Sequence, residues 1–144
     1  MGNDESKIRK IIDKRINAIK NKDIDKATID YSSDVIFYDM VDPLEQCGME
    51  GIRNRLKDLL KQIVKIVDYE IIKTDIHISK NVAFHSGLNH IKAITADMND
   101  LDMWWRETSC YLKIKGIWKI SHSHISVPFD AESGIASVGL KPDQ

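Results

Sequence analysis

The hydrophobic pattern of this 144-residue chain changes its period near residue 66, and that change limits the possible folds more than any other feature. Before residue 66, apolar side chains recur at the spacing of a helix. The clearest helical stripe consists of Ile8, Ile11, Ile12, Ile16 and Ile19. After residue 66, long segments alternate with a period of two, as strands do. Helices followed by a run of strands are typical of an α+β domain.

The pattern predicts three helices, with one short strand between the second and the third. We expect helices from about residue 3 to 19, from the N-cap candidate Asp23 to about Tyr31, and from about Glu50 to Lys65, with the strand at 35–38. Long strands joined by tight turns form an antiparallel meander, which twists and curls. The four strands expected after residue 66 lie at 67–79, 82–98, 103–115 and 117–127.

Composition excludes several classes of function. The chain has 21 basic and 22 acidic residues, so its balanced charge does not favour nucleic acid or an anionic membrane as a partner. No apolar run is long enough to cross a bilayer.

Cys47 and Cys110 form no Cys-x-x-Cys pair and no secretory signal opens the chain, so we expect a cytoplasmic protein with free thiols. One domain over 1–130 with a C-terminal tail over 131–144 is expected.

Two stretches of the sequence resemble a known family. The first runs from Phe37 through Asp39, Asp42-Pro43 and Gly48 to Arg53, and the second covers 105–108 and 116–129, with Gly116-Ile117-Trp118-Lys119-Ile120 at its centre. Together they resemble SnoaL-like, ketosteroid-isomerase-related proteins of the NTF2-like superfamily. The resemblance implies an NTF2-like cone, in which N-terminal helices pack on a curved antiparallel sheet around one pocket, and it implies a homodimer. It does not decide the chemistry, because this fold hosts many activities.

The resemblance also implies one candidate base. Ketosteroid isomerase uses an Asp as general base, which is one of the worked cases of pKa tuning. Counting without gaps from the second helix places this base at Asp39, and Asp42 would serve only if the loop were shorter. The oxyanion-binding Tyr of the isomerase falls on Arg15. The carboxylic acid that assists this Tyr in the isomerase has no clear equivalent, because the nearest residue, Glu107, falls on the face expected to point outward. Steroid isomerisation is therefore not expected.

Alternation along the last strand makes two histidines candidate catalytic residues. Trp118, Ile120, His122 and His124 share a face by period two, and the face that carries Trp118 must be buried. The histidines would then point into the cone, either as core residues with satisfied ring nitrogens or as proton shuttles. His-x-His spacing also suits a metal, and His77, His85 or His90 could in principle complete the site. The spacing is common by chance, however, so no metal site is predicted.

The same rule applied to the preceding strand gives candidate ligand-binding residues. Trp104, Arg106 and Thr108 share a face, and an inward Arg106 needs a carboxylate such as Asp39 or an anionic or carbonyl-bearing ligand. Tyr31 and Tyr38 lie near the expected mouth of the pocket, where aromatic side chains belong either to the core or to the ligand site. Trp118 completes the predicted set of ligand contacts.

Two hypotheses about function follow. In the first, the chain binds a small, partly apolar carbonyl or carboxylate compound and acts as a cofactor-independent acid–base enzyme, with Asp39 as the base, a histidine as the shuttle and Arg106 as the clamp. In the second, it is a non-catalytic binding or assembly domain. A second apolar face predicts a homodimer through the convex side of the sheet. The residues assigned to that face are Trp105, Tyr111, Ile125 and Val127.

Overall fold

The computed structural model describes residues 2–143 and contains three helices and six strands. The helices are α1 (Gly2–Lys20), α2 (Ile24–Thr28) and α3 (Gly48–Lys61). The strands are β1 (Tyr31–Tyr38), β2 (Gln46–Cys47), β3 (Ile63–Ser79), β4 (Val82–Thr95), β5 (Asp100–Ile114) and β6 (Ile117–Ser126). The predicted order of helices followed by a meander is therefore confirmed, as is the N-cap at Asp23, which accepts a hydrogen bond from the Lys26 N–H at 3.1 Å.

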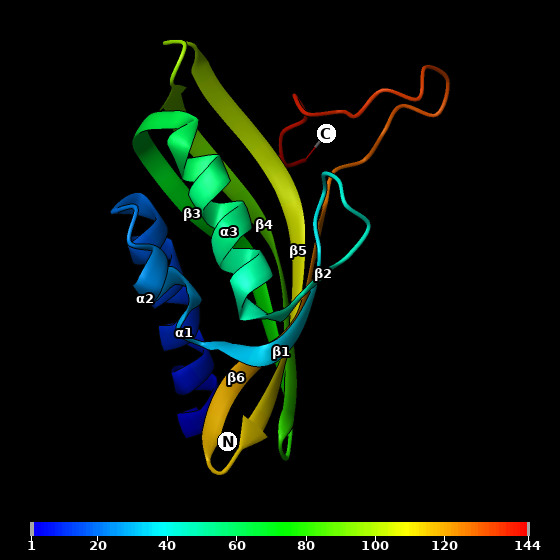
Figure 1. The fold of residues 1–144 in the computed structure, drawn as a ribbon. Helices are drawn as coiled ribbons and strands as arrows, with labels where there is room; N and C mark the ends of the chain where they lie inside the picture. Colours follow the sequence, from blue (N-terminus) through cyan, green and yellow to red (C-terminus); the bar gives the residue numbers. More distant parts are fainter. Residues whose placement is uncertain (1, 144) are drawn as a thin grey trace.

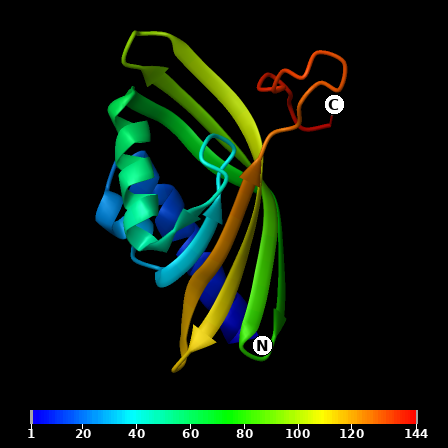
Figure 2. The ribbon, with the colours of Figure 1, turned by 45° about the vertical axis from the view of Figure 1, so that its right-hand side comes forward.

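One six-stranded sheet forms the body of the molecule, in the order β2-β1-β6-β5-β4-β3. All neighbouring strands are antiparallel except β1 and β6, which are parallel. The sheet curves around α1 and α3, which lie on its concave side (Figures 1 and 2). Three register shifts along β3 support the curvature, because a bulge bends and twists the strand that carries it. This is the α+β cone that the sequence predicts.

Two helices end earlier than predicted, β5 begins earlier than predicted, at Asp100, and β2 is an additional short strand. Helix α2 ends at Thr28 and β1 already begins at Tyr31, so β1 is longer than the predicted strand over 35–38. Helix α3 ends at Lys61, and Ile63 belongs to β3. In both cases an apolar side chain from the end of the predicted helix is buried in the sheet instead. Tyr31 and Ile63 are only 6% and 4% exposed, so tertiary burial decided their conformation.

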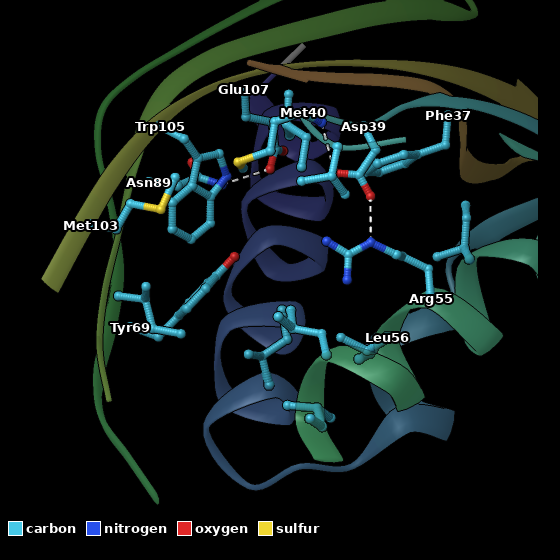
Figure 3. A pocket seen from close by; sticks show the side chains of 18 of the residues that line it. Phe37, Asp39, Met40, Arg55, Leu56, Tyr69, Asn89, Met103, Trp105 and Glu107 are labelled. Atoms are coloured by element: carbon cyan, nitrogen blue, oxygen red, sulfur yellow. Dashed lines mark hydrogen bonds and ion pairs between the residues drawn. The ribbon is translucent and has the colours of Figure 1, made fainter. Parts of the chain in front are cut away.

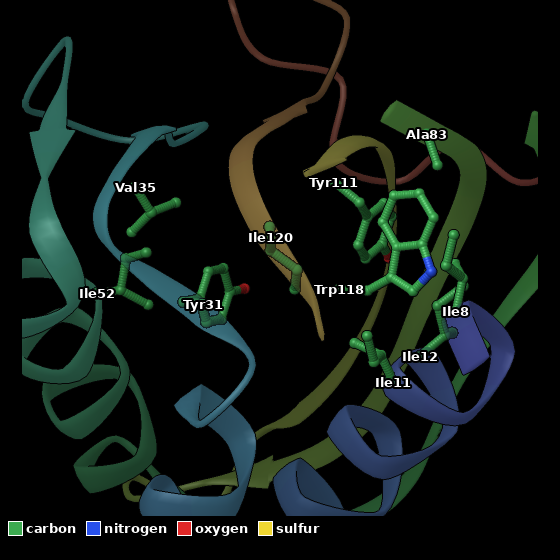
Figure 4. Packing of buried hydrophobic residues seen from close by; sticks show 10 residues of the cluster. All are labelled: Ile8, Ile11, Ile12, Tyr31, Val35, Ile52, Ala83, Tyr111, Trp118 and Ile120. Carbon is green, nitrogen blue, oxygen red and sulfur yellow. The ribbon is translucent and has the colours of Figure 1, made fainter. Parts of the chain in front are cut away.

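The concave face is divided between a cavity (Figure 3) and a packed core (Figure 4). In the core, the first turns of α1 place isoleucines against the last two strands, and burial of each such side chain stabilises the fold by about 1.5–3 kcal/mol. The Trp118 ring is buried there, and its Nε1–H donates to Asp4 of α1 at 3.0 Å. The α1 residues of this core are Ile8, Ile11 and Ile12, and its sheet residues include Ala83, Tyr111, Trp118 and Ile120.

A bulge in β6 overturns the predicted orientation of the histidines. Tyr111 pairs with Ile120, but Cys110 pairs with His122, so Ser121 is an extra residue in β6. An extra residue reverses the alternation beyond it. Ser123 is therefore buried, and Ile125 and Val127 line the cavity. His122 and His124 fall on the convex face, and the prediction that they point into the cone is wrong.

The C-terminal segment folds back over one side of the cavity. Phe129 and Ala136 form an isolated bridge, and the Ser137 N–H donates to the carbonyl oxygen of Pro128 at 2.8 Å. This turn brings Ala136 and Val138 into the cavity wall. Among residues 2–143, no helix is long and apolar enough to cross a membrane.

Candidate functional site

A cavity of about 440 Å³ lies between α3 and the concave face of the sheet. This volume falls within the range of small-molecule sites, which are mostly apolar with a few placed polar groups. Figure 3 shows Leu56 of α3 facing Met103 and Trp105 of the sheet across the cavity. Further apolar wall residues are Ile19, Leu59, Ile63, Ile91 and Leu101.

An ion pair between Arg15 and Glu107 lies at the inner end of the cavity. Nη1 and Nη2 of Arg15 donate to Oε2 and Oε1 of Glu107 at 3.2 and 3.0 Å, and the two side chains are only 7% and 2% exposed. Burial opposes both charges, but each charge stabilises the other. The pKa of Glu107 therefore lies well below its usual range, and the pKa of Arg15 lies well above its own.

Further donors saturate the Glu107 carboxylate. Asn89 Nδ2–H donates to Oε1 at 2.8 Å, and the Ser109 hydroxyl donates to Oε2 at 2.9 Å. His85 Nε2 also lies 2.9 Å from Oε2, while His85 Nδ1 and the Tyr111 hydroxyl are 2.8 Å apart. Each of its oxygens accepts from two donors, so this carboxylate has no free lone pair with which to act as a base. We conclude that Glu107 holds its neighbours in place.

Two neutral groups lie beside this ion pair. Because the Glu107 oxygens only accept, the nitrogen of the Asn89 amide must face Glu107 and the amide oxygen must face away. That oxygen has no hydrogen-bond partner among residues 2–143. Burial raises the pKa of Tyr69 far above its usual value, so its hydroxyl stays protonated, and Figure 3 shows this hydroxyl pointing into the cavity. Arg15, Tyr69, Asn89 and Glu107 form what we call the inner polar cluster.

A second polar group, the pair of Asp39 and Arg55, lies on the other side of the cavity. Asp39 directly follows β1, and its Oδ1 accepts from the Met40 N–H at 2.7 Å. Its Oδ2 accepts from Arg55 Nε–H at 2.8 Å, and the Asp39 side chain is only 2% exposed. Figure 3 shows the two terminal nitrogens of Arg55 directed into the cavity. The pair is neutral overall, so it suits a neutral polar group on a ligand, such as a carbonyl.

The structure brings only two of the predicted site residues to the cavity, Asp39 and Tyr31. Trp118 is buried in the core beneath α1. Arg106, Thr108 and Trp104 share a face of β5, as predicted, but it is the convex face: Arg106 donates to the Ser126 hydroxyl at 3.1 Å and Trp104 stacks on His90. Asp39, Arg106 and a histidine therefore do not converge.

The predicted residues that lie on the convex face form a separate group. His122 Nδ1 donates to the carbonyl oxygen of Ile36 at 2.8 Å, and Tyr38 packs edge-on against both His122 and His124. None of the three lines the cavity. Among residues 2–143, no group of three or more His, Cys, Asp or Glu side chains is placed to hold a metal ion.

Sequence reasoning missed most of the polar groups in the cavity. Arg15 lies one turn from Ile11 and Ile19, within the apolar stripe of α1, and this position was a usable signal. Glu107 was assigned to the outer face because β5 has two apolar faces of similar strength. Arg55 was not distinguished from the solvated face of α3. No local pattern identified Tyr69 or Asn89.

The fold and the cavity together define an α+β protein whose curved, open sheet encloses a cavity. The chain belongs to the SnoaL-like family, whose domain model matches residues 8–130, and its fold is NTF2-like. No curated protein matches the chain.

Several solved structures share this fold. An NTF2-like protein of unknown function from Pseudomonas putida is 25% identical, with a TM-score of 0.87 and 99% of each chain covered. An NTF2-like superfamily protein from Salmonella enterica is 20% identical, with a TM-score of 0.75 over 90% of this chain and 94% of that one. A protein provisionally named a scytalone dehydratase, from Novosphingobium aromaticivorans, is 10% identical, with a TM-score of 0.75 over 85% and 82%. These two more distant likenesses concern the fold alone.

Proposed function

We propose that the chain binds a small, mostly apolar carbonyl compound in the cavity and acts on it by acid–base chemistry. The observation that carries this proposal is the position of Asp39, a buried carboxylate at the wall of an otherwise apolar cavity of about 440 Å³. An apolar wall binds the carbon skeleton, and a carboxylate there can reach a carbon-bound proton. The unfilled cavity favours this hypothesis over a purely structural assembly domain.

The proposed reaction is proton transfer next to the carbonyl group. The Asp39 carboxylate removes a proton from the carbon beside the carbonyl, and the electron pair moves onto the carbonyl oxygen to give an enolate. The terminal N–H groups of Arg55 stabilise that oxygen, because Nε alone is used to hold Asp39. Asp39 then returns the proton to the same or to a conjugated carbon. The net change is an exchange or an isomerisation and needs no oxidant or cofactor.

Hydrogen–deuterium exchange tests this proposal. 2-Tetralone is a bicyclic ketone with acidic protons beside its carbonyl, and NMR in deuterated buffer follows their loss. We expect the protein to accelerate the exchange and Asp39→Asn to reduce that acceleration by about 100-fold or more, since Asn cannot accept the proton. Affinity for 2-tetralone, measured by calorimetry, should change little in the variant.

Asp42→Asn is the matched control. Asp42 lies in the same loop but is exposed and does not line the cavity, so this variant should retain the full exchange rate. If Asp42→Asn abolished the exchange while Asp39→Asn did not, Asp42 would be the base. If the wild-type protein bound 2-tetralone without accelerating exchange, the chain would be a binding protein and not an enzyme.

We also propose that the chain forms a homodimer through the convex face, although not through the residues that the sequence indicated. Trp105, Ile125 and Val127 line the cavity and Tyr111 is in the core, so none is available to a partner. The apolar side chains exposed on the convex face instead include Val82, Phe84 and Leu112, which are 54%, 44% and 40% exposed. Light scattering at micromolar concentration should give twice the mass of the chain, whereas a strict monomer would exclude the dimer.

A further inference from the structure

The amide oxygen of Asn89 is one of two buried amide oxygens in the cavity wall without a hydrogen-bond partner among residues 2–143, and the other is that of Gln46. Asn89 is completely buried and lines the cavity, yet this oxygen has no hydrogen-bond partner among the described residues. An acceptor that is buried without a donor costs free energy, so such an acceptor in a cavity wall indicates that a ligand supplies the donor.

The amide of Asn89 cannot rotate to hide this oxygen. Its nitrogen donates to Glu107, and a flipped amide would set its oxygen against a carboxylate that is itself fixed by the charge of Arg15. Arg15 and Glu107 are therefore positioning residues: they keep the Asn89 oxygen available. A bidentate buried pair is a rigid support for this purpose.

The Tyr69 hydroxyl complements the Asn89 oxygen. The two side chains come from neighbouring strands. Burial raises the pKa of Tyr69, and the charge of Arg15 and an interaction with the Asn89 side chain offset part of that rise. The Tyr69 hydroxyl points into the cavity in Figure 3, and Tyr69 lines its wall. One acceptor and one protonated hydroxyl at the same end of a cavity match a ligand group that donates one hydrogen bond and accepts another.

We propose that Tyr69 and Asn89 bind a hydroxyl group of the ligand, whose O–H donates to Asn89 Oδ1 and whose oxygen accepts from Tyr69. This inference rests on the proposed function, because it adds a second polar end to the same carbonyl compound. The ligand class becomes a mostly apolar hydroxy-ketone, with the carbonyl at Arg55 and the hydroxyl at the inner polar cluster. A net charge of zero at both ends of the cavity disfavours carboxylates and amines.

Matched probes test the proposal: 2-tetralone and its isomers with one hydroxyl on the aromatic ring. Calorimetry should show that at least one hydroxylated isomer binds about tenfold more tightly than 2-tetralone, the effect of one to two net hydrogen bonds. Tyr69→Phe keeps the packed ring, and Asn89→Val removes the acceptor with a residue that suits a strand. Each should abolish the preference for the hydroxylated isomer. Tyr38→Phe, the same substitution on the convex face, should retain the preference.

The outcomes separate this inference from the proposed function. Equal affinity of the wild-type protein for all probes would overturn the hydroxyl site and leave the ketone site standing. A preference that persisted in folded Tyr69→Phe and Asn89→Val would also overturn it. Failure of every probe to bind would contradict the proposed function and this inference together. Circular dichroism establishes whether each variant is folded. If Asn89→Val is unfolded, the result for Tyr69→Phe alone tests the hydroxyl site.

Discussion

At the scale of single residues, the ion pair of Arg15 and Glu107 organises the cavity. Breaking a buried pair leaves one charge without compensation, which costs about 3–5 kcal/mol. The pair also holds Asn89 through Glu107 Oε1. Its effect on the site is therefore indirect. The pair fixes the orientation of the neutral Asn89 amide, while its two charges compensate each other.

Glu107→Gln tests the role of the pair in stability. We expect the variant to lose about 3–5 kcal/mol of the free energy of unfolding at pH 7, measured by urea titration. The pKa of Glu107 is lowered in the folded protein, so its contribution is complete above the unfolded-state pKa of about 4.3. It declines as the pH falls below that value and is lost below the folded-state pKa. The difference between variant and wild type should shrink accordingly in acid, and a difference independent of pH would contradict this account.

Single residues were also where sequence reasoning was least complete. Asp39 could be identified because the family resemblance fixes the residue count from the second helix through Asp39 to Gly48. Arg55 and Asn89 could not, because their roles depend on contacts between different elements, such as the contact between Asp39 and Arg55, which are 16 positions apart in the sequence. A residue's neighbours across a sheet are set by register, which no local pattern encodes.

At the scale of elements, the bulge at Ser121 decides which side chains of β6 reach the cavity. Period-two alternation holds from Trp118 to Ile120 and again from Ser123 onward, but the two segments are out of phase. The sequence shows an apolar residue at 118, 120, 125 and 127, which is the trace of this phase change. Strict alternation over the whole strand therefore predicted the wrong face for both histidines.

Alanine substitution of the two histidines tests their placement on the convex face. His124→Ala removes an exposed side chain and should change the free energy of unfolding by no more than about 0.5 kcal/mol. His122→Ala also removes the hydrogen bond to the Ile36 carbonyl, worth about 1 kcal/mol. Neither variant should alter the affinity for 2-tetralone between pH 5 and 8. If either variant bound 2-tetralone more weakly than the wild type, or if its affinity depended on pH differently, the substituted histidine would belong to the ligand site.

At the scale of the whole molecule, the order of elements was predictable and the shape of the cavity was not. Helical and period-two stripes require a sheet with helices on one side, which the structure confirms. The cavity depends on features with no such signal: the register shifts that curve β3, the early end of α3, and the C-terminal segment that adds Ala136 and Val138 to the wall.

The C-terminal segment provides a test of the cavity at this scale. Val138→Asp places a charge in the apolar wall and should weaken 2-tetralone binding at least several-fold, because a buried carboxylate without a partner is costly. Ile135→Asp is the matched control, since Ile135 lies in the same segment, is 68% exposed and does not line the cavity. Equal affinities of the two variants, measured by calorimetry, would show that this segment does not close the ligand site.

The most direct measurement of the central claim is a crystal structure of the protein with the tightest-binding hydroxylated 2-tetralone. Density for the ligand is expected inside the cavity between α3 and the sheet, with the carbonyl oxygen within hydrogen-bond distance of a terminal Arg55 nitrogen. The carbon beside the carbonyl should face Asp39, and the hydroxyl should lie between Tyr69 and Asn89. An empty cavity at saturating ligand, or a ligand bound on the convex face beside His122 and Arg106, would contradict it.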